Sequence, residues 1–351
     1  MKTILATGGF GFIGSHTCVE LLKEGYRIIV IDSLVNSSSK VIKKIKKINS
    51  LYSINNKGKI SFVCGDMRDL DLLDRVFHDA IENKNRIDAV IHFAGLKSVY
   101  ESLQNPLEYW EVNFGGTVNL LKIIKKYYCS VLIFSSSATI YCPKSISPIT
   151  EKAPIDPITP YGKTKEAVEK LLDDFYYANR NTISIASLRY FNPIGAHPSG
   201  LIGEETVGTP TNIFPILNKV ASGEIEKLRI FGNDWNTLDG TGVRDFVHVV
   251  DIAKGHVKVL NYLKDRNSQI LKLNLGTGKG TSVLQLINTF QKVNKVKIPF
   301  VFDKRRDGDR DIVYADNSLA IKILKWEPQK TIEEMCEDGW RWKCFESNKL
   351  N

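Results

Sequence analysis

The chain opens with Thr3-Ile4-Leu5-Ala6-Thr7-Gly8-Gly9-Phe10-Gly11-Phe12-Ile13-Gly14, the stretch that decides its fold. Apolar residues before the glycines predict a buried strand, the glycines predict a tight turn, and the apolar periodicity after them predicts a helix. Gly8 permits the turn, Gly11 lets backbone N–H groups approach a pyrophosphate, and Gly14 lets the helix and the strand pack closely. A strand, a glycine turn and a helix in this order are typical of a dinucleotide-binding domain.

The end of the second predicted strand indicates which dinucleotide is bound. The apolar run at residues 27–31 ends in Asp32, eighteen positions after Gly14. A carboxylate at this place accepts hydrogen bonds from the adenosine ribose hydroxyls and repels a 2′-phosphate, so NAD is expected rather than NADP. The plainer alternative is a glycine loop that only closes a turn. The strand, turn, helix, second strand and terminal Asp together favour the cofactor.

The same alternation continues along the chain. Short apolar runs at residues 61–63, 89–93, 131–134 and 183–188 are separated by helical segments. This pattern predicts an α/β fold with a Rossmann-type, doubly wound parallel sheet. Ligands of such sheets bind beyond the carboxyl ends of the strands. One crevice is therefore expected to collect the residues that follow the predicted strands, namely Gly8, Asp32, Asp66, Ala94 and Ser135.

A smaller, mixed α/β lobe that binds the substrate is expected in the second half. After residue 193 the chain becomes rich in Gly, Pro and Thr, with short strands and helices between loops. We expect an NAD-binding domain at residues 1–190 with a return segment at 241–270. The substrate-binding domain is expected at 191–240 and 271–351.

Composition limits the other classes of function. The chain has 351 residues, a net charge of +9, six cysteines and six histidines. Many of the positive charges lie in residues 40–48, where apolar residues at helical spacing indicate a solvated amphipathic helix rather than a nucleic-acid site. No apolar run is long enough for a membrane span, and the opening strand leaves no room for a secretory signal. Neither metal-ligand spacing nor a disulfide framework is visible, so we expect no metal, reduced thiols and a cytoplasmic protein.

A hydroxyl relay and a Tyr/Lys pair provide candidate chemistry. Ser135-Ser136-Ser137 follows a predicted strand, and Tyr161-Gly162-Lys163-Thr164-Lys165 follows later. Tyr161 and Lys165 are four positions apart, which places both on one face of a helix. A phenol has a pKa near 10, and a positive charge about 4 Å away contributes roughly 4 kcal/mol at an effective dielectric near 20. Lys165 and an oxidised nicotinamide are therefore expected to make Tyr161 a base, with Ser137 carrying the proton. The alternative is an ordinary amphipathic helix.

Across nearly its whole length the chain resembles the UDP-glucose 4-epimerases, which are extended short-chain dehydrogenases/reductases. The motifs that carry this resemblance are Thr7 to Gly14, Asp32 to Leu34, His92 to Lys97, Ser135 to Tyr141, Tyr161 to Lys165, Arg189 to Gly200, Ile230 to Asp234 and Asp239 to Asp245. The later motifs are more specific than the glycine turn. The resemblance implies that Tyr161 takes the proton of the sugar 4-hydroxyl while NAD takes the C4 hydride. The 4-keto sugar then turns and is reduced on its other face.

The site residues follow from the predicted strands and from the resemblance. The cofactor contacts expected are Gly8, Gly11, Phe12, Ile13, Gly14, Asp32, Ser33, Asn36, Asp66, Met67, Phe93, Ala94, Gly95, Lys97, Asn113, Ser137, Tyr161, Lys165 and Phe191. The substrate contacts that the resemblance implies are Ser137, Tyr161, Asn192, Asn212, Ile213, Arg229, Ile230, Phe231, Arg244, Arg306, Asp309 and Val313. Arg244 and Arg306 suit a diphosphate, because a guanidinium presents a bidentate fork to phosphate oxygens.

Two positions depart from the family pattern. Cys142 stands where the family usually has Gly, which affects a turn and no catalytic role. Val313 stands where a large tyrosine restricts the family's pocket to unmodified hexoses. We hypothesise that Val313 leaves room for an N-acetyl group, as in UDP-N-acetylglucosamine and its galacto epimer. Differences in nearby loops that close the pocket are the alternative.

Particular residues oppose two rival functions. A nucleotide-sugar 4,6-dehydratase needs an acid/base pair before the residue that corresponds to Tyr141, and Ala138 and Thr139 stand there instead. A nonenzymatic NAD-binding regulator would have no need of Ser137, Tyr161 and Lys165. We also expect a homodimer, because the helix after Tyr161 and the one at residues 113–124 carry enough apolar surface for a four-helix interface. Core packing is the alternative use of that surface.

Overall fold

The computed structural model describes residues 1–52, 58–205, 208, 210–264, 266–306 and 308–347. The chain forms two compact units. The first contains Met1–Ile140, Ile155–Arg189 and Ala253–Leu273, and the second contains Tyr141–Pro154, Tyr190–Ile252 and Asn274–Asn351. The return to the first unit, expected at 241–270, thus runs from Ala253 to Leu273. Each unit is described by itself below.

A seven-stranded sheet forms the centre of the first unit. Its strands are β1 (Thr3–Thr7), β2 (Arg27–Asp32), β3 (Lys59–Cys64), β4 (Ile87–His92), β5 (Val131–Ser137), β6 (Ser184–Tyr190) and β11 (Ile270–Leu275). They lie in the order β11-β6-β5-β4-β1-β2-β3. The pairs β1–β2, β2–β3, β1–β4 and β4–β5 are parallel. The strand order reverses beside β1, and ligands of this fold bind at the carboxyl ends of the strands at such a point. The predicted doubly wound α/β class is confirmed.

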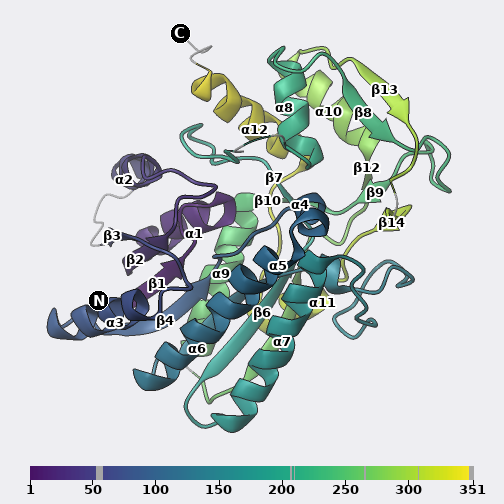
Figure 1. Ribbon diagram of the computed structural model, residues 1–351. Coiled ribbons are helices and arrows are strands. Elements are labelled where there is room, and N and C mark those ends of the chain that lie inside the picture. Colours follow the sequence, from purple (N-terminus) through teal and green to yellow (C-terminus); the bar gives the residue numbers. More distant parts are fainter. Residues whose placement is uncertain (53–57, 206–207, 209, 265, 307, 348–351) are drawn as a thin grey trace. The chain divides into compact units, whose positions relative to one another are not determined.

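Helices surround this sheet (Figure 1). They are α1 (Phe12–Lys23), α2 (Val41–Tyr52), α3 (Leu70–Glu82), α4 (Val99–Gln104), α5 (Pro106–Tyr109), the π-helix η1 (Trp110–Gly115), α6 (Gly116–Lys126), the 3-10 turn η2 (Ala138–Ile140), α7 (Pro160–Ala178) and α9 (Val249–Lys264). The amphipathic helix expected at residues 40–48 is α2, in which Val41, Ile45 and Ile48 are buried.

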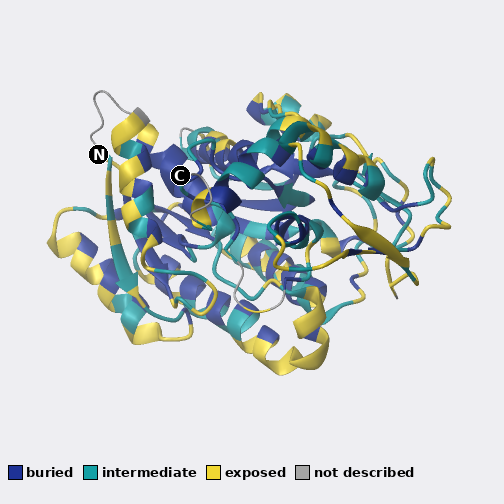
Figure 2. Ribbon diagram, turned by 90° about the horizontal axis from the view of Figure 1, so that it is seen from above, coloured by how far each residue is buried: buried dark blue, intermediate teal, exposed yellow. Residues whose placement is uncertain are grey.

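The core of the first unit lies between the strands and the helices. Leu5 of β1 packs in one cluster with Phe77 of α3, Leu120 of α6 and Val168 of α7. All five residues of β1 are buried, as expected for a parallel strand covered on both faces. Figure 2 shows buried strands inside and exposed residues on the outer helices. Each large apolar side chain so buried contributes about 1.5–3 kcal/mol to folding.

The second unit combines three small sheets with helices. Its strands are β7 (Asn192–Ile194), β8 (Leu228–Phe231), β9 (Val243–Arg244), β10 (Phe246–His248), β12 (Thr281–Ser282), β13 (Phe300–Asp303) and β14 (Ile312–Val313). They pair as β10-β7, β12-β9-β14 and β13-β8. The helices are α8 (Ile213–Ala221), α10 (Val283–Asn294), α11 (Ser318–Leu324) and α12 (Ile332–Glu346). Phe214, Phe290 and Met335 join α8, α10 and α12 in one core.

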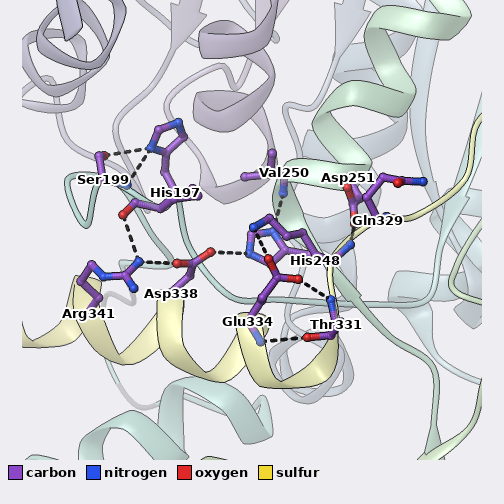
Figure 3. A network of polar contacts seen from close by, with 12 residues as sticks. His197, Ser199, His248, Val250, Asp251, Gln329, Thr331, Glu334, Asp338 and Arg341 are labelled. Atoms are coloured by element: carbon purple, nitrogen blue, oxygen red, sulfur yellow. Dashed lines mark hydrogen bonds and ion pairs between the residues drawn. The ribbon is translucent and has the colours of Figure 1, made fainter. Parts of the chain in front are cut away.

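A buried polar network fastens α12 to β10 (Figure 3). The Nδ1 atom of His248 accepts a hydrogen bond from Val250 N at 3.0 Å, so its Nε2 carries the proton and donates to Asp338 at 3.3 Å. Arg341 binds the other oxygen of Asp338 and also donates to the carbonyl of Pro198 at 3.0 Å. Burial opposes ionisation of Asp338, but the bonds from His248 and Arg341 outweigh it and lower the pKa of the carboxyl.

Of the described helices, none combines the length and the apolar composition that crossing a bilayer requires.

Candidate active site

The glycine turn after β1 is shaped by close backbone contacts. Gly8 has φ +65°, and a Cβ there would lie 2.6 Å from Ala94 N. A Cβ on Gly14 would lie 2.6 Å from Gly8 O. Gly14 therefore packs against the glycine turn, whereas the sequence predicts only a contact between the helix and the strand. A Cβ on Gly11 would meet only Gly8 O at 3.4 Å. The space before Gly11 is thus open to a ligand, which fits the pyrophosphate of a dinucleotide.

The carboxylate of Asp32 joins this turn to the end of β2. Its Oδ2 accepts from Phe10 N at 2.9 Å, and its Oδ1 accepts from Leu34 N at 3.0 Å and from Ser37 Oγ at 2.7 Å. A buried carboxylate held at the carboxyl end of β2 suits the hydroxyls of an adenosine ribose. The sequence predicts Ser33 and Asn36 of the same loop as cofactor contacts and gives no signal for Ser37.

The remaining cofactor candidates of the first unit follow its strands. Asp66 lies after β3 and is bound by Arg68, whose side chain donates at 3.0 and 2.7 Å and lowers the pKa of the carboxyl. Met67 is buried in the core. Phe93, Ala94, Gly95 and Lys97 lie in the loop between β4 and α4.

Asn113 holds this loop from the π-helix η1. Its Oδ1 accepts from Leu96 N at 2.7 Å, while its Nδ2 donates to Leu96 O and to Thr164 Oγ1, each at 3.1 Å. A π-helical turn often marks a functional site. The sequence predicted a regular helix from Asn113 and gave no signal for this turn.

The start of α7 positions the Tyr/Lys pair. The side chain of Thr159 accepts from Gly162 N at 3.2 Å, and Pro160 occupies the first turn. This cap fixes the helix so that Tyr161 and Lys165 lie one turn apart. The Nζ of Lys165 is 5.8 Å from the centre of the Tyr161 ring.

Lys165 is anchored to β5 below the pair. Its Nζ donates to Ser135 O at 2.7 Å and lies 4.8 Å from the centre of the Phe134 ring. Burial lowers the pKa of Lys165 to about 8, and the charge of Glu169 opposes this shift. The serine triplet lies inside β5, and not after the strand as the sequence predicts.

In the chain alone, the pKa of Tyr161 is set mainly by burial. Burial raises the pKa of Tyr161, and its hydrogen bond with Ser137 only partly offsets this. Ser137 Oγ also accepts from Thr139 N at 3.2 Å and from Thr139 Oγ1 at 3.0 Å. In the chain alone, Lys165 therefore does not bring the pKa of the Tyr161 phenol down toward neutral pH. The positive charge of an oxidised nicotinamide is needed in addition.

The substrate candidates other than Ser137 and Tyr161 belong to the second unit, as does Phe191. Arg244 lies 3.6 Å from Asp309, and the Arg306 guanidinium stacks 3.7 Å from the centre of the Phe231 ring. Because Asp309 N donates to Arg306 O at 3.2 Å, the same turn holds both arginines. Desolvation lowers the pKa of each guanidinium, a condition in which an anion is bound strongly.

The other substrate candidates lie on neighbouring elements of this unit. Val313 of β14 lies opposite Arg244 of β9 in the parallel pair that these two strands form. Arg229 and Ile230 belong to β8, and exposed Arg229 lies 3.5 Å from Asp303. Asn212 and Ile213 start α8, and Asn192 starts β7.

Residues 5–339 match the model of the family described as GDP-mannose 4,6 dehydratase. With its sheet order and Tyr/Lys helix, this match places the chain in the class of extended short-chain dehydrogenases/reductases. UDP-glucose 4-epimerase of Bacillus subtilis is 47% identical over 346 residues, covering 98% of each chain, and UDP-glucose 4-epimerase 1 of rice is 46% identical over 345 residues, covering 97% of this chain and 94% of its own. The chain belongs to the UDP-glucose 4-epimerase family.

Solved structures agree with this assignment. UDP-glucose 4-epimerase from Stenotrophomonas maltophila, crystallised with NAD and formylated UDP-arabinopyranose, is 42% identical with a TM-score of 0.93, and the match covers 100% of both chains. The enzyme from Bifidobacterium longum, in complex with NAD+ and UDP, is 42% identical with a TM-score of 0.91, covering 99% of this chain and 100% of its own.

Proposed function

We propose that this protein interconverts UDP-glucose and UDP-galactose by transient oxidation at C4 of the sugar, with bound NAD. The observation that carries the proposal is the Tyr161/Lys165 pair on α7 beside Ser137, in a unit whose glycine turn and Asp32 suit NAD. The family membership supports the same reaction. When bound, NAD supplies a hydride acceptor that returns the hydride in the same turnover.

The residues of α7 and β5 move the proton. Tyr161, as phenolate, accepts the proton of the 4-hydroxyl, which leaves a carbonyl at C4 once the hydride has departed. Ser137 hydrogen-bonds the same oxygen and passes the proton to Tyr161. Lys165 supplies positive charge that stabilises the phenolate. Return of the hydride to C4 and of the proton to the C4 oxygen completes either epimer, because the planar ketone can receive the hydride on either face.

Residues of the second unit bind the nucleotide in this proposal. Arg244 and Arg306 hold the diphosphate, and Asp309 orients both guanidinium groups. Residues 229–231 contact the uracil, while Asn192, Asn212 and Ile213 complete the contacts with the UDP-sugar. The Arg306 guanidinium lies 3.7 Å from the centre of the Phe231 ring, so the end of β8 and the loop after β13 present an aromatic ring and a phosphate-binding fork together.

Elimination of water is disfavoured at this site. A 4,6-dehydratase needs a carboxylic acid near the sugar C5 and C6, and η2 offers Ala138 and Thr139. The dehydratase is therefore the weaker proposal, although the matching family model is described by the name of a 4,6 dehydratase. A regulator without activity is opposed by the intact Ser137, Tyr161 and Lys165.

Val313 extends the proposal to N-acetylated sugars. It occupies the strand position beside Arg244, where a tyrosine would add a ring next to the diphosphate-binding side chain. We expect turnover of UDP-N-acetylglucosamine and its galacto epimer. Normal turnover of UDP-galactose together with none of the N-acetylated pair would reject this extension.

A homodimer is also part of the proposal. Val168 and Leu172, expected at the interface, are fully buried in the core of the first unit. The surface that we propose for a partner is the Leu107 stripe, defined as Leu103, Leu107, Trp110 and Phe114, which lie on the consecutive helices α4, α5 and η1. Helices α4 and α5 lie against α7. A second copy of the chain is the occupant we propose.

We further propose that the protein works in the cytoplasm, since its six cysteines are all free thiols in the structure.

One experiment tests the reaction and the retained cofactor together. Purified protein is mixed with UDP-galactose, without added NAD, and the products are separated by chromatography. UDP-glucose is the expected product. A stable 4-keto-6-deoxy sugar would instead identify a dehydratase, and unchanged UDP-galactose, even with NAD added, would contradict the proposal.

A further inference from the structure

A buried carboxylate lies one helical turn beyond Lys165. Glu169 follows Lys165 by four positions on α7, the same spacing that joins Tyr161 to Lys165. Arg189 of β6 donates to Glu169 through Nε at 3.0 Å and through its terminal nitrogen at 2.6 Å, and Ser136 Oγ donates at 2.6 Å. Three bonds therefore fix the carboxylate on the face of α7 that carries the candidate base.

This triad is inaccessible to solvent. Arg189 is 0% exposed, Ser136 1% and Glu169 2%. Ion pairs at such depth seldom add net stability, because desolvation of both charges offsets their attraction. Apolar residues of similar volume would serve packing equally well. The charge of Arg189 accounts for a buried carboxylate here, but the place of Glu169 one turn from Lys165 requires an explanation of its own.

The neighbours of Lys165 supply one. Ser136 of the triad is adjacent in β5 to Ser135, whose carbonyl accepts from Lys165 Nζ at 2.7 Å. On the β4 side lies His92, which burial and the charge of Lys165 keep neutral by lowering its pKa to about 3. Tyr161 lies one turn before Lys165 on α7, and Arg189 of β6 binds Glu169. Among the described residues, Glu169 is the carboxylate whose charge favours protonated Lys165.

We infer that Glu169 is a positioning residue of the active site, which keeps the Lys165 ammonium charged and aimed along α7 toward Tyr161, while Arg189 and Ser136 fix the carboxylate. This inference deepens the proposed function and rests on it for the consequence in catalysis. Arg189 limits the effect of Glu169, because its own positive charge disfavours a second cation nearby. The two buried charges thus act on Lys165 in opposite directions.

The direct test is a titration of Lys165 that needs no turnover. Protein containing lysine labelled with carbon-13 at Cε is titrated with base and followed by NMR, and the Lys165 signal is the one absent from Lys165→Met. Glu169→Gln, which keeps the side-chain shape, is expected to lower the pKa of Lys165 by about one to two units. Arg189→Gln is expected to raise it, since the carboxylate then acts alone.

A matched control lies on the same helix. Glu166 pairs with Lys170 at 2.7 Å and is adjacent to Lys165 in sequence, on a different side of α7. Glu166→Gln is expected to leave the Lys165 titration unchanged. If Glu169→Gln does not fold, Glu169→Asp keeps the charge but withdraws it by one methylene, and a smaller decrease is expected.

Turnover of UDP-galactose across pH supplies the catalytic readout. In Glu169→Gln the alkaline limb of the kcat profile is expected to move to lower pH by the same amount as the Lys165 titration. An unchanged Lys165 titration in a folded variant would overturn the inference, as would a shift in the same direction in both Glu169→Gln and Arg189→Gln. Failure of the wild-type protein to epimerise UDP-galactose would reject the proposed function alone, since the NMR titration stands without it.

Discussion

At the scale of single residues, Tyr161 in the chain alone is protonated at neutral pH. Burial raises the pKa of its phenol, and the ammonium of Lys165 is engaged by the carbonyl of Ser135. A base that ionises only when a cation is bound does not take protons while the oxidised cofactor is absent. The oxidised nicotinamide is the cation that the proposed reaction provides.

This dependence on cofactor charge predicts a pH shift. Oxidised NAD is expected to lower the pKa of Tyr161 by about two units or more relative to protein freed of cofactor, because a cation stabilises phenolate and not phenol. Ultraviolet difference absorbance of the phenolate measures the titration, with Tyr161→Phe subtracted to isolate this residue. Equal titration midpoints with and without NAD would disprove the charge mechanism.

At the scale of elements, the two glycines of the β1–α1 junction have different work. A methyl on Gly14 collides with the carbonyl of Gly8, whereas a methyl on Gly11 meets no atom closer than 3.4 Å. The first glycine is required by the protein itself. We expect the second to be required by the cofactor that binds in front of it.

Alanine at each position separates these requirements. Gly14→Ala is expected to lower the free energy of unfolding by about 1–3 kcal/mol, because backbone atoms must move. Gly11→Ala is expected to keep stability within about 1 kcal/mol of the wild type and to lose bound NAD. Urea unfolding of cofactor-free protein and the NAD content after purification measure the two effects. Equal destabilisation by both substitutions would refute the distinction.

These elements also show what the sequence reveals and what it hides. The strand, the glycine turn, Asp32 and the Tyr161/Lys165 spacing are local patterns, and the NAD-binding fold followed from them, whereas the family resemblance rests on motifs along nearly the whole chain. The bonds of Glu169 join positions 20 and 33 residues apart, which no local pattern encodes. The π-helix η1 forms around Asn113, whose side chain bonds Leu96 and Thr164 across the fold. The four-residue spacing of Glu169 from Lys165 is the one local pattern that points to the buried cluster of Glu169, Arg189 and Ser136.

The buried polar network between β10 and α12 gives a prediction about stability and pH. Asp338→Asn is expected to lower the free energy of unfolding by about 2–4 kcal/mol at neutral pH, since the buried carboxylate that receives His248 and Arg341 is lost. The pKa of Asp338 is lowered in the folded state, so its contribution is full above the unfolded pKa and vanishes as pH falls through the folded one. The difference between variant and wild type is therefore expected to shrink below about pH 4.

Urea unfolding followed by circular dichroism at several pH values checks this. Asp234→Asn is the matched control, because its exposed carboxylate also binds an arginine, Arg305, at 2.8 Å. That change is expected to leave stability unaltered. A constant difference across the whole pH range would show that the Asp338 carboxylate titrates normally in the folded protein.

At the scale of the whole molecule, the exposed apolar side chains are unevenly distributed. The Leu107 stripe lies on the consecutive helices α4, α5 and η1, and its members Leu103, Leu107 and Trp110 are exposed. Other exposed apolar residues of the described chain are scattered over helices, the strand β13 and loops, and Ile146 and Leu238 lie in loops. A group of exposed apolar side chains on neighbouring helices is suited to helices of a second copy, whereas isolated loop residues need no partner.

Leu107→Glu is expected to convert the protein from dimer to monomer in sedimentation experiments at micromolar concentration. Leu107 is 77% exposed in the single chain, so a charge there is tolerated by the fold and opposed only by an interface. Ile146→Glu places the same charge on a residue that is 88% exposed in a loop, and its sedimentation is expected to match the wild type. Circular dichroism verifies that both variants are folded. A wild-type monomer, or a Leu107→Glu dimer, would place the interface elsewhere or remove it, and the stripe would then need another occupant.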